Sequence, residues 1–383
     1  MADQIFLHIG LPKTATTYLQ TIVWNARDQL RDDGVLLPGV GPRDHLWTAR
    51  AVCEHKVMET ATTRQRAAWD RVRAEIAEAD GRVLLTHEFL ASATAEQARG
   101  MVEALQPAEV HLVLTARETL GLFTASWQES LKNRGTRPMA DYPGSARRVA
   151  QPVWHWHTLD LREVLERWTD AVPTDRVHIL PLPGPGAPRQ LIWQRFAGLI
   201  GVDPSAYATD GFVNSSMGVA EAETLRRVNQ HLVERDLLGH RHERGTMIRT
   251  YLADQRLVPR GGDRFWPTPP QIEECRTRAD RAIGYVAEHG YHVVGDLEDL
   301  RVPDRLEERR EAGSATDAEV AEIATDLVAQ LLGDVYAVRQ ERNAARRALD
   351  QALLVVPPPP PPPPRWRALA GRVRGRLTRR SST

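Results

Sequence analysis

The chain has 383 residues, of which 42% are hydrophobic and 26% charged, proportions typical of a globular protein. This length suits one large α/β domain with extensions, or two domains. The formal net charge is zero, but residues 365–383 contain seven Arg and no acidic residue, so the body is mildly acidic. A body without a basic surface predicts no nucleic-acid partner.

The two cysteines, Cys53 and Cys275, lie far apart and lack the spacing of metal ligands. We therefore expect both to be buried thiols in a reducing compartment rather than a disulfide. The N-terminus shows no charged-then-apolar signal region, and no apolar run approaches the length that spans a bilayer. These features predict a cytoplasmic protein.

Short apolar runs alternate with longer amphipathic stretches up to residue 200. The predicted strands are residues 4–9, 35–37, 82–86, 110–115 and 176–182. The predicted helices are residues 16–30, 62–79, 95–105, 120–133, 159–171 and 189–200. This alternation is typical of an α/β fold with a mostly parallel sheet and helices on both faces.

The remainder of the chain is predicted to be mainly helical. Helices are expected at residues 219–234, 246–257 and 270–289, and the compact domain is expected to end near residue 300. A charged linker at 301–316 should lead into a long amphipathic helix at 317–356. Its apolar spacing suits either packing on its own domain or a short coiled coil that makes a homodimer.

Eight prolines at 357–364 should form a stiff, extended spacer. The basic segment 365–383 that follows places Trp366, Leu369, Val373 and Leu377 at helical spacing among its arginines. This pattern predicts peripheral contact with an anionic membrane, at its inner face, or else a merely soluble tail.

The stretch from Gly10 to Thr17, GLPKTATT, joins the first predicted strand to the first predicted helix. Glycine allows a tight turn, and the following amides can point at an anion together with the positive end of the helix dipole. Lys13 adds a full positive charge, and the threonines add hydroxyl donors. The stretch therefore predicts an anion-binding loop.

The spacing of this loop differs from that of a nucleotide triphosphatase, which needs G-x-x-x-x-G-K-[ST]. Lys13 follows Gly10 by only three residues, and no later strand ends in the Asp expected to help hold magnesium. A smaller anionic group on a 5′ position, bound without metal, fits the loop better.

The segment Lys13, Thr14, Ala15, Thr16, Thr17, Tyr18, Leu19 resembles the 5′-phosphosulfate-binding loop of sulfotransferases that use 3′-phosphoadenosine 5′-phosphosulfate. Their pattern is close to K-[TS]-G-T-T-x-[LW], and only Ala15 departs from it. The resemblance covers about the first 300 residues. It implies a P-loop NTPase-like three-layer sandwich, 3′-phosphoadenosine 5′-phosphosulfate as co-substrate, no metal, and binding of that co-substrate by the loop residues from Lys13 to Tyr18.

The family's second motif places an Arg at the end of a later strand and a Ser about eight residues further on, which together bind the 3′-phosphate. Arg117 directly follows the predicted strand 110–115. Ala125 stands at the family's usual Ser position, with Thr124 before it and Ser126 after it. The resemblance therefore suggests Arg117 with Ser126, or with Thr124 as a substitute.

Sulfuryl transfer resembles phosphoryl transfer, so catalysis should rest on positioning and on charge stabilisation, with Lys13 neutralising the bridging oxygen of the leaving phosphate. The acceptor must also lose a proton. His87 and Glu88 follow the third predicted strand, whose carboxyl end should face the ligand crevice. The resemblance favours Glu88 as the base over His87.

Several other polar residues are interpreted more simply. His8 is expected to be a core residue behind the loop, and His155 and His157 are expected to pack rather than bind zinc. His45 is a candidate for the acceptor pocket. Asn214, Ser215 and Ser216 either contact a ligand or cap the next helix.

The leading hypothesis is therefore a sulfotransferase that acts on a hydroxyl of a carbohydrate, a glycolipid or a small metabolite. The alternatives are a nucleotide-dependent kinase and a non-catalytic scaffold that retains the nucleotide-binding fold. The departures at Ala15 and Ala125 favour the scaffold, whereas the position of Lys13 and the missing magnesium ligand disfavour the kinase.

Overall fold

The computed structural model describes residues 2–144, 155–184, 186–209 and 216–355. The expectations for Asn214, Ser215, the proline spacer and the basic segment fall outside these residues. No helix of the described part is long and apolar enough to cross a membrane.

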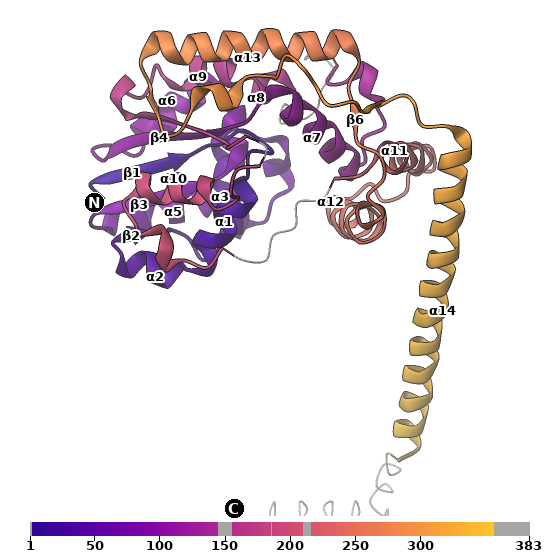
Figure 1. Cartoon of the computed structure of the whole chain (residues 1–383). Coiled ribbons are helices and arrows are strands. Elements are labelled where there is room, and N and C mark those ends of the chain that lie inside the picture. Colours follow the sequence, from indigo (N-terminus) through magenta and orange to yellow (C-terminus); the bar gives the residue numbers. More distant parts are fainter. Residues whose placement is uncertain (1, 145–154, 185, 210–215, 356–383) are drawn as a thin grey trace, which may run out of the picture. The chain divides into compact units, whose positions relative to one another are not determined.

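Six strands of the described chain form one sheet in which all neighbouring strands are parallel (Figure 1). Their order across the sheet is β2 (Val35–Leu36), β3 (Arg82–Thr86), β1 (Gln4–His8), β4 (Glu109–Ala116), β5 (Val177–Pro181) and β7 (His292–Val293). The first five confirm the predicted strands to within one or two residues. The edge strand β7 was not predicted, because two residues are too few to show an alternating pattern.

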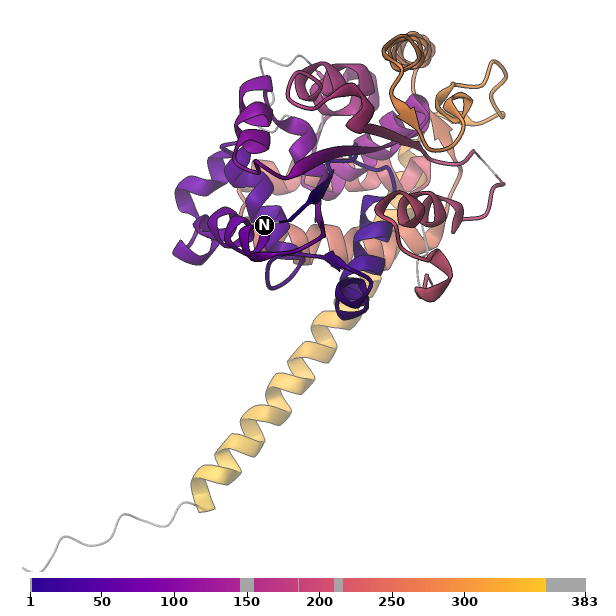
Figure 2. The same cartoon turned by 90° about the vertical axis from the view of Figure 1, so that its left-hand side faces the viewer.

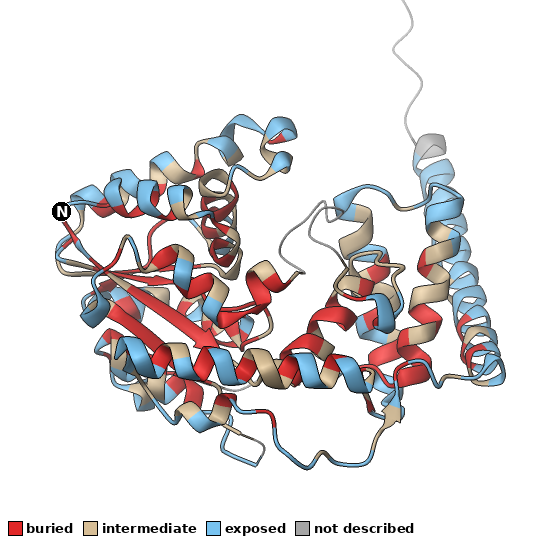
Figure 3. Cartoon of the chain, turned by 90° about the horizontal axis from the view of Figure 1, so that it is seen from above, coloured by how far each residue is buried: buried red, intermediate tan, exposed pale blue. Residues whose placement is uncertain are grey.

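Both faces of the sheet are buried (Figure 3). One face carries Phe6, Leu84 and Val113, which join the apolar core formed with helices α1 (Thr16–Asn25) and α10 (Leu191–Ile200). The other face carries side chains that are equally buried, such as Leu7, Leu85 and Leu112. The sheet thus lies between two layers of helices (Figure 2), which confirms the predicted α/β fold class.

The helices of the first 200 residues match the predicted ones with four differences. The remaining members of this set are α2 (Arg27–Asp32), α3 (Pro42–Val52), α4 (Thr63–Arg66), α5 (Ala68–Glu78), α6 (Ala95–Glu103), α7 (Thr119–Lys132), α8 (Trp156–Leu159) and α9 (Leu161–Trp168). The predicted helix 16–30 breaks at Ala26, and the predicted helix 62–79 breaks at Ala67. Helix α3 and the short helix α8 were not predicted.

Beyond residue 216 the chain is mainly helical, as expected. Helices α11 (Val219–Glu234), α13 (Pro269–His289) and α14 (Asp317–Val355) agree with the prediction within one residue. Between them, a short helix α12 (Arg241–Glu243) leads into η8 (Arg244–Leu257). The helix predicted at 246–257 corresponds to η8, which is a π-helix.

The predicted linker 301–316 contains a strand, β8 (Arg310–Glu311), which pairs in parallel with β6 (Phe265–Trp266). The chain divides into two compact units, the first ending at Ile323 and the second beginning at Ala324. The first unit therefore includes the start of α14 and extends beyond the expected end near residue 300.

Candidate active site at the carboxyl end of β1

The loop between β1 and α1 contains three residues with positive φ. Gly10 has a φ of 28°, Lys13 of 67° and Ala15 of 62°. A Cβ at Gly10 would come within 2.6 Å of the Thr16 methyl group and 2.8 Å of the Thr115 hydroxyl, so only glycine fits there. Ala15 adopts the left-handed conformation that the corresponding glycine of the sulfotransferase loop would adopt without strain.

These left-handed residues turn the chain so that amides at the start of α1 have no protein partner. The backbone N–H groups of Ala15, Thr16 and Thr17 donate to no residue of the described chain. They lie at the N-terminal end of a ten-residue helix, where the helix dipole favours negative charge. The loop therefore has the donor arrangement of an anion site.

The threonine side chains of the loop differ in their accessibility. Thr17 is exposed, whereas Thr14 and Thr16 are buried. The Thr14 hydroxyl donates to the Leu11 carbonyl at 2.5 Å, inside the protein. The sequence analysis expected every loop threonine to offer a donor to the anion, but of these three only Thr17 presents an exposed side chain. Tyr18 is also buried.

A chain of buried hydrogen bonds connects the loop to side chains of the sheet. The Thr14 hydroxyl oxygen is 2.8 Å from Thr115 Oγ1, which is 3.1 Å from His8 Nε2, and His8 Nδ1 is 2.8 Å from Thr86 Oγ1. Because Thr14 donates to Leu11, Thr115 donates to Thr14 and His8 Nε2–H donates to Thr115; a neutral His8 then accepts from Thr86 at Nδ1. Burial lowers the pKa of His8 to about 4, which is consistent with the neutral ring that this chain requires.

Lys13 is held by a carboxylate that the sequence analysis did not identify. Lys13 Nζ is 3.0 Å from Oε2 of Glu129 on α7, and Arg249 of the π-helix η8 contacts the other oxygen. Burial acts to raise the pKa of Glu129, but the charges of Lys13 and Arg249 outweigh it and lower that pKa to about 2. The three groups together carry one net positive charge beside the loop.

Glu88 also lies close to the loop helix. Gln20, one turn after Thr16 on α1, donates through Nε2 to Glu88 Oε2 at 3.1 Å. The Glu88 side chain is partly exposed. Since Glu88 follows β3, the strand beside β1, the sheet brings it to the edge where the loop lies.

His87 is more buried than Glu88, and its ring nitrogen Nδ1 accepts the Phe89 amide at 3.1 Å. The neutral imidazole must then carry its proton on Nε2, where it is a donor. Burial lowers the pKa of His87, although the charge of Glu88 opposes this. The geometry therefore leaves Glu88 as the better proton acceptor of the two.

Arg117 directly follows β4, the other neighbour of β1. Its guanidinium lies against Gly121 in the first turn of α7, where an added Cβ would be 2.9 Å from Nη2. It has no hydrogen bond or ion pair with another described residue. Burial lowers its pKa, and the charge of Glu118 opposes this shift.

The two hydroxyls suggested as partners of Arg117 point in different directions. Ser126 is fully buried and lies 2.6 Å from the Tyr142 hydroxyl, so its side chain faces the protein interior. Thr124 is partly exposed and donates to the Leu120 carbonyl at 2.9 Å. Helical spacing places Thr124 and Ala125, and not Ser126, on the same face as Gly121 and Arg117. Of the two suggestions, the structure therefore leaves Thr124.

His45, His155 and His157 are bonded to backbone groups of the protein. Both ring nitrogens of His45 are bonded to the backbone, at Pro38 and Thr86, and the side chain is 1% exposed, so it lines no acceptor pocket. His155 and His157 bond the carbonyls of Gly144 and Ser92. In the part of the chain that is described, no group of three or more potential ligands is placed to hold a metal ion.

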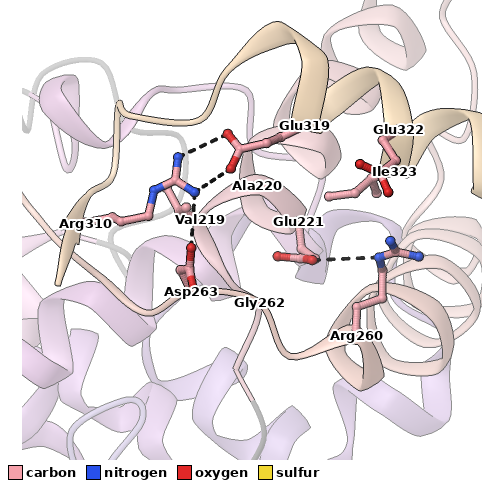
Figure 4. Close-up of a pocket in the computed structure, with 10 residues that line it drawn as sticks. All are labelled: Val219, Ala220, Glu221, Arg260, Gly262, Asp263, Arg310, Glu319, Glu322 and Ile323. Carbon is pink, nitrogen blue, oxygen red and sulfur yellow. Dashed lines mark hydrogen bonds and ion pairs between the residues drawn. The ribbon is translucent and has the colours of Figure 1, made fainter.

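A separate hollow of about 220 Å³ contains none of these residues (Figure 4). It lies between the start of α11, the segment around Gly262 and the first turns of α14. Arg310 pairs there with Glu319 at 2.5 Å and with Asp263 at 3.3 Å, and Arg260 faces Glu221 at 3.7 Å. With Glu322, four carboxylates thus line this hollow against two arginines, which leaves it with a net negative charge.

Comparison with known proteins gives one structural likeness. A sulfotransferase from Alicyclobacillus acidocaldarius is similar to this chain with a TM-score of 0.37 and 16% sequence identity, over 60% of this chain and 91% of that one. No protein-family model matches the sequence, and no curated protein matches it significantly. At this TM-score the likeness carries no argument about activity, which must be inferred from the loop itself.

Proposed function

We propose that this protein is a sulfotransferase that moves a sulfuryl group from 3′-phosphoadenosine 5′-phosphosulfate to a hydroxyl of a carbohydrate, a glycolipid or a small metabolite. The observation that supports it most is the loop at the end of β1. Its left-handed residues leave three amides beside Lys13, at the N-terminus of α1, that donate to no residue of the described part of the chain. This site suits one compact 5′ anion and lacks the longer arch of a triphosphate loop.

Each candidate residue has a defined role in this proposal. The amides of Ala15, Thr16 and Thr17 would hold the 5′-phosphate, and Lys13 would neutralise the charge that develops on the bridging oxygen. Arg117, with Thr124 beside it, would bind the 3′-phosphate. Glu88 would accept the proton of the acceptor hydroxyl. The nucleotide supplies the group that is transferred.

Ligand binding separates this function from its two alternatives. Calorimetry should compare adenosine 3′,5′-bisphosphate in the presence of EDTA with ATP and magnesium. Tighter binding of the bisphosphate supports the sulfotransferase. A preference for ATP with magnesium supports a kinase, and binding of neither nucleotide supports a scaffold.

Two substitutions test the assigned roles. Lys13→Ala should lower sulfuryl transfer at least ~100-fold through kcat, because it removes charge stabilisation of the leaving group. Arg117→Ala should mainly weaken binding of the bisphosphate, by about ten-fold or more. Lys56→Ala, at an exposed lysine, is the matched control and should change neither quantity. Wild-type kinetics in both site variants would refute the assignment.

A further inference from the structure

The second unit presents an apolar stripe along α14. Val328, Leu331, Val335, Val338 and Leu349 are between 36% and 62% exposed. They follow one another at intervals of three and four residues, except where Arg342 and Ala345 take the intervening positions. We call these five apolar residues the α14 stripe. Along the part of α14 that carries the stripe, most of the helix is coloured as exposed (Figure 3).

The spacing of the stripe is that of a coiled coil. An average repeat of 3.5 residues keeps one seam facing a partner helix, whereas the surface of a helix packed on a globular domain follows a repeat of 3.6. With Val328 and Val335 at the a positions, Leu331 occupies a d position. β-branched residues at a with Leu at d favour two strands, a pattern that Leu331 fulfils, while Val338 and Ala345 occupy the next two d positions. A single polar residue at a, here Arg342, restricts the register.

The charges beside the stripe identify the partner and its direction. In this register Asp334 and Glu341 fall at g positions, and Arg339 and Arg346 fall at e positions. A parallel second copy places each g residue opposite the e residue five positions later, so Asp334 meets the second copy's Arg339 and Glu341 meets its Arg346. An antiparallel copy would instead bring like charges together.

We propose that residues 324–352 form a parallel, two-stranded coiled coil with a second copy of this chain. The helix itself favours this occupant, because its charges complement those of an identical helix in register. A long helix with an exposed apolar seam also gains most of its stability when that seam is buried. The inference does not depend on the proposed enzymatic function.

The mass of the full-length chain in solution tests whether the α14 stripe forms the dimer interface. Sedimentation equilibrium should show a monomer–dimer equilibrium for the wild type. The double variant L331Q/V335Q should weaken dimerisation at least ~100-fold, because polar side chains would occupy the seam. Y336Q changes a more exposed residue outside the stripe and should dimerise like the wild type. Circular dichroism should show wild-type helix content in Y336Q, whereas L331Q/V335Q should lose part of the helix signal of α14, because the buried seam stabilises that helix.

Charge exchange tests the identity of the partner. R339E/R346E and D334R/E341R should each dimerise at least about ten-fold more weakly than the wild type, because every g–e′ pair then repels. An equimolar mixture of the two variants should form a heterodimer of wild-type affinity. The proposal would be overturned if the wild-type chain formed trimers, or if it stayed monomeric even at 100 times the concentration used for the variants. It would also be overturned if the mixture of the two variants remained monomeric.

The direction is tested by one added cysteine. In a parallel dimer, Leu349→Cys places two thiols opposite each other at an a position, and mild oxidation should yield a covalent dimer. The wild type, with Cys53 and the buried Cys275, is the control. A noncovalent dimer in which Leu349→Cys does not cross-link would contradict the parallel arrangement.

Discussion

Lys13 and Glu129 define the electrostatics of the candidate site at the scale of single residues. Lys13 Nζ lies 3.0 Å from a carboxylate that also pairs with Arg249. An incoming anion must therefore compete with Glu129 for Lys13. Because the pKa of Glu129 is near 2, this competition persists over the whole physiological pH range.

The variant Glu129→Gln tests this competition. Removing the carboxylate raises the net charge of the cluster by one, so adenosine 3′,5′-bisphosphate should bind about three- to ten-fold more tightly. Calorimetry at low and high salt measures the effect, which should shrink as salt rises. Asp254→Asn, which unpairs Lys132 instead, is the control. Weaker binding in Glu129→Gln would show that the carboxylate positions Lys13 rather than competing for it.

Ala15 is a second residue whose effect on the free energy of unfolding can be measured. Its φ of 62° is unfavourable for any side chain with a Cβ. Ala15→Gly should raise the free energy of unfolding by about 0.5–1 kcal/mol, after allowance for the lost methyl packing. Urea titration measures it. Ala26→Gly, where φ is −105°, offers no such relief and should destabilise the chain.

At the scale of elements, helix α7 shows how helix periodicity selects the hydroxyl that can accompany Arg117. Its buried face carries Ser126 and Glu129, and its partly exposed face carries Gly121 and Thr124. A shift of two positions along the helix thus separates the buried hydroxyl of Ser126 from the accessible hydroxyl of Thr124. The π-helix η8 matters for the same reason, since its winding sets which side chain reaches Glu129.

The segment between η8 and β6 makes a tight approach to α11 (Figure 4). Gly262 has a φ of 69°, and a Cβ there would be 2.2 Å from Glu221 Oε2, a side chain that is 5% exposed. Gly262→Ala should therefore cost about 3 kcal/mol of stability or more. Gly290→Ala, at a left-handed position with a φ of 63° and open space around it, should cost only about 1 kcal/mol.

Adding Glu221→Ala to Gly262→Ala separates the two causes. The double variant removes the steric clash but keeps the unfavourable φ, so its further loss relative to Glu221→Ala alone should be close to that of Gly290→Ala. Urea titration of all four variants measures this. Equal effects of the two glycine substitutions would contradict the close approach to Glu221.

At the scale of the whole molecule, buried histidines predict acid sensitivity. Burial lowers the pKa of His8, His45 and His178 from 6.5 to about 4, and the neighbouring His111 and His292 add to the shift of His178. Between pH 6.5 and 4 the unfolded chain binds more protons at these sites than the folded chain. The free energy of unfolding should therefore fall as the pH falls through this window, by up to about 3 kcal/mol per histidine.

Urea titrations at several pH values between 7.5 and 4.5 measure this slope. His178→Gln should reduce the loss of stability at low pH, because one buried site no longer takes up a proton only on unfolding. His231→Gln changes an exposed side chain and should keep the full loss. A slope that is the same in His178→Gln and in the wild type would contradict the assignment.

The sequence by itself determined the alternation of strands and helices, the anion loop and Arg117 at a strand end. These are local signals: buried strands read as apolar runs, and a glycine followed by Lys and Thr marks the turn into a helix. The partners of those residues were decided only by the tertiary structure. Glu129 lies 116 residues from Lys13, and Arg249 lies 120 residues from Glu129, so no periodicity links them.

Burial likewise depended on packing between distant elements. Ser126 faces the core, where its hydroxyl lies against that of Tyr142. His45 is buried because both its ring nitrogens form hydrogen bonds with the backbone of Pro38 and Thr86. The very short strands β7 and β6 carry too few residues for a pattern and form only where a longer neighbour or a paired segment aligns them. Long-range packing therefore assigned the side chains of the site, whereas local sequence assigned its backbone.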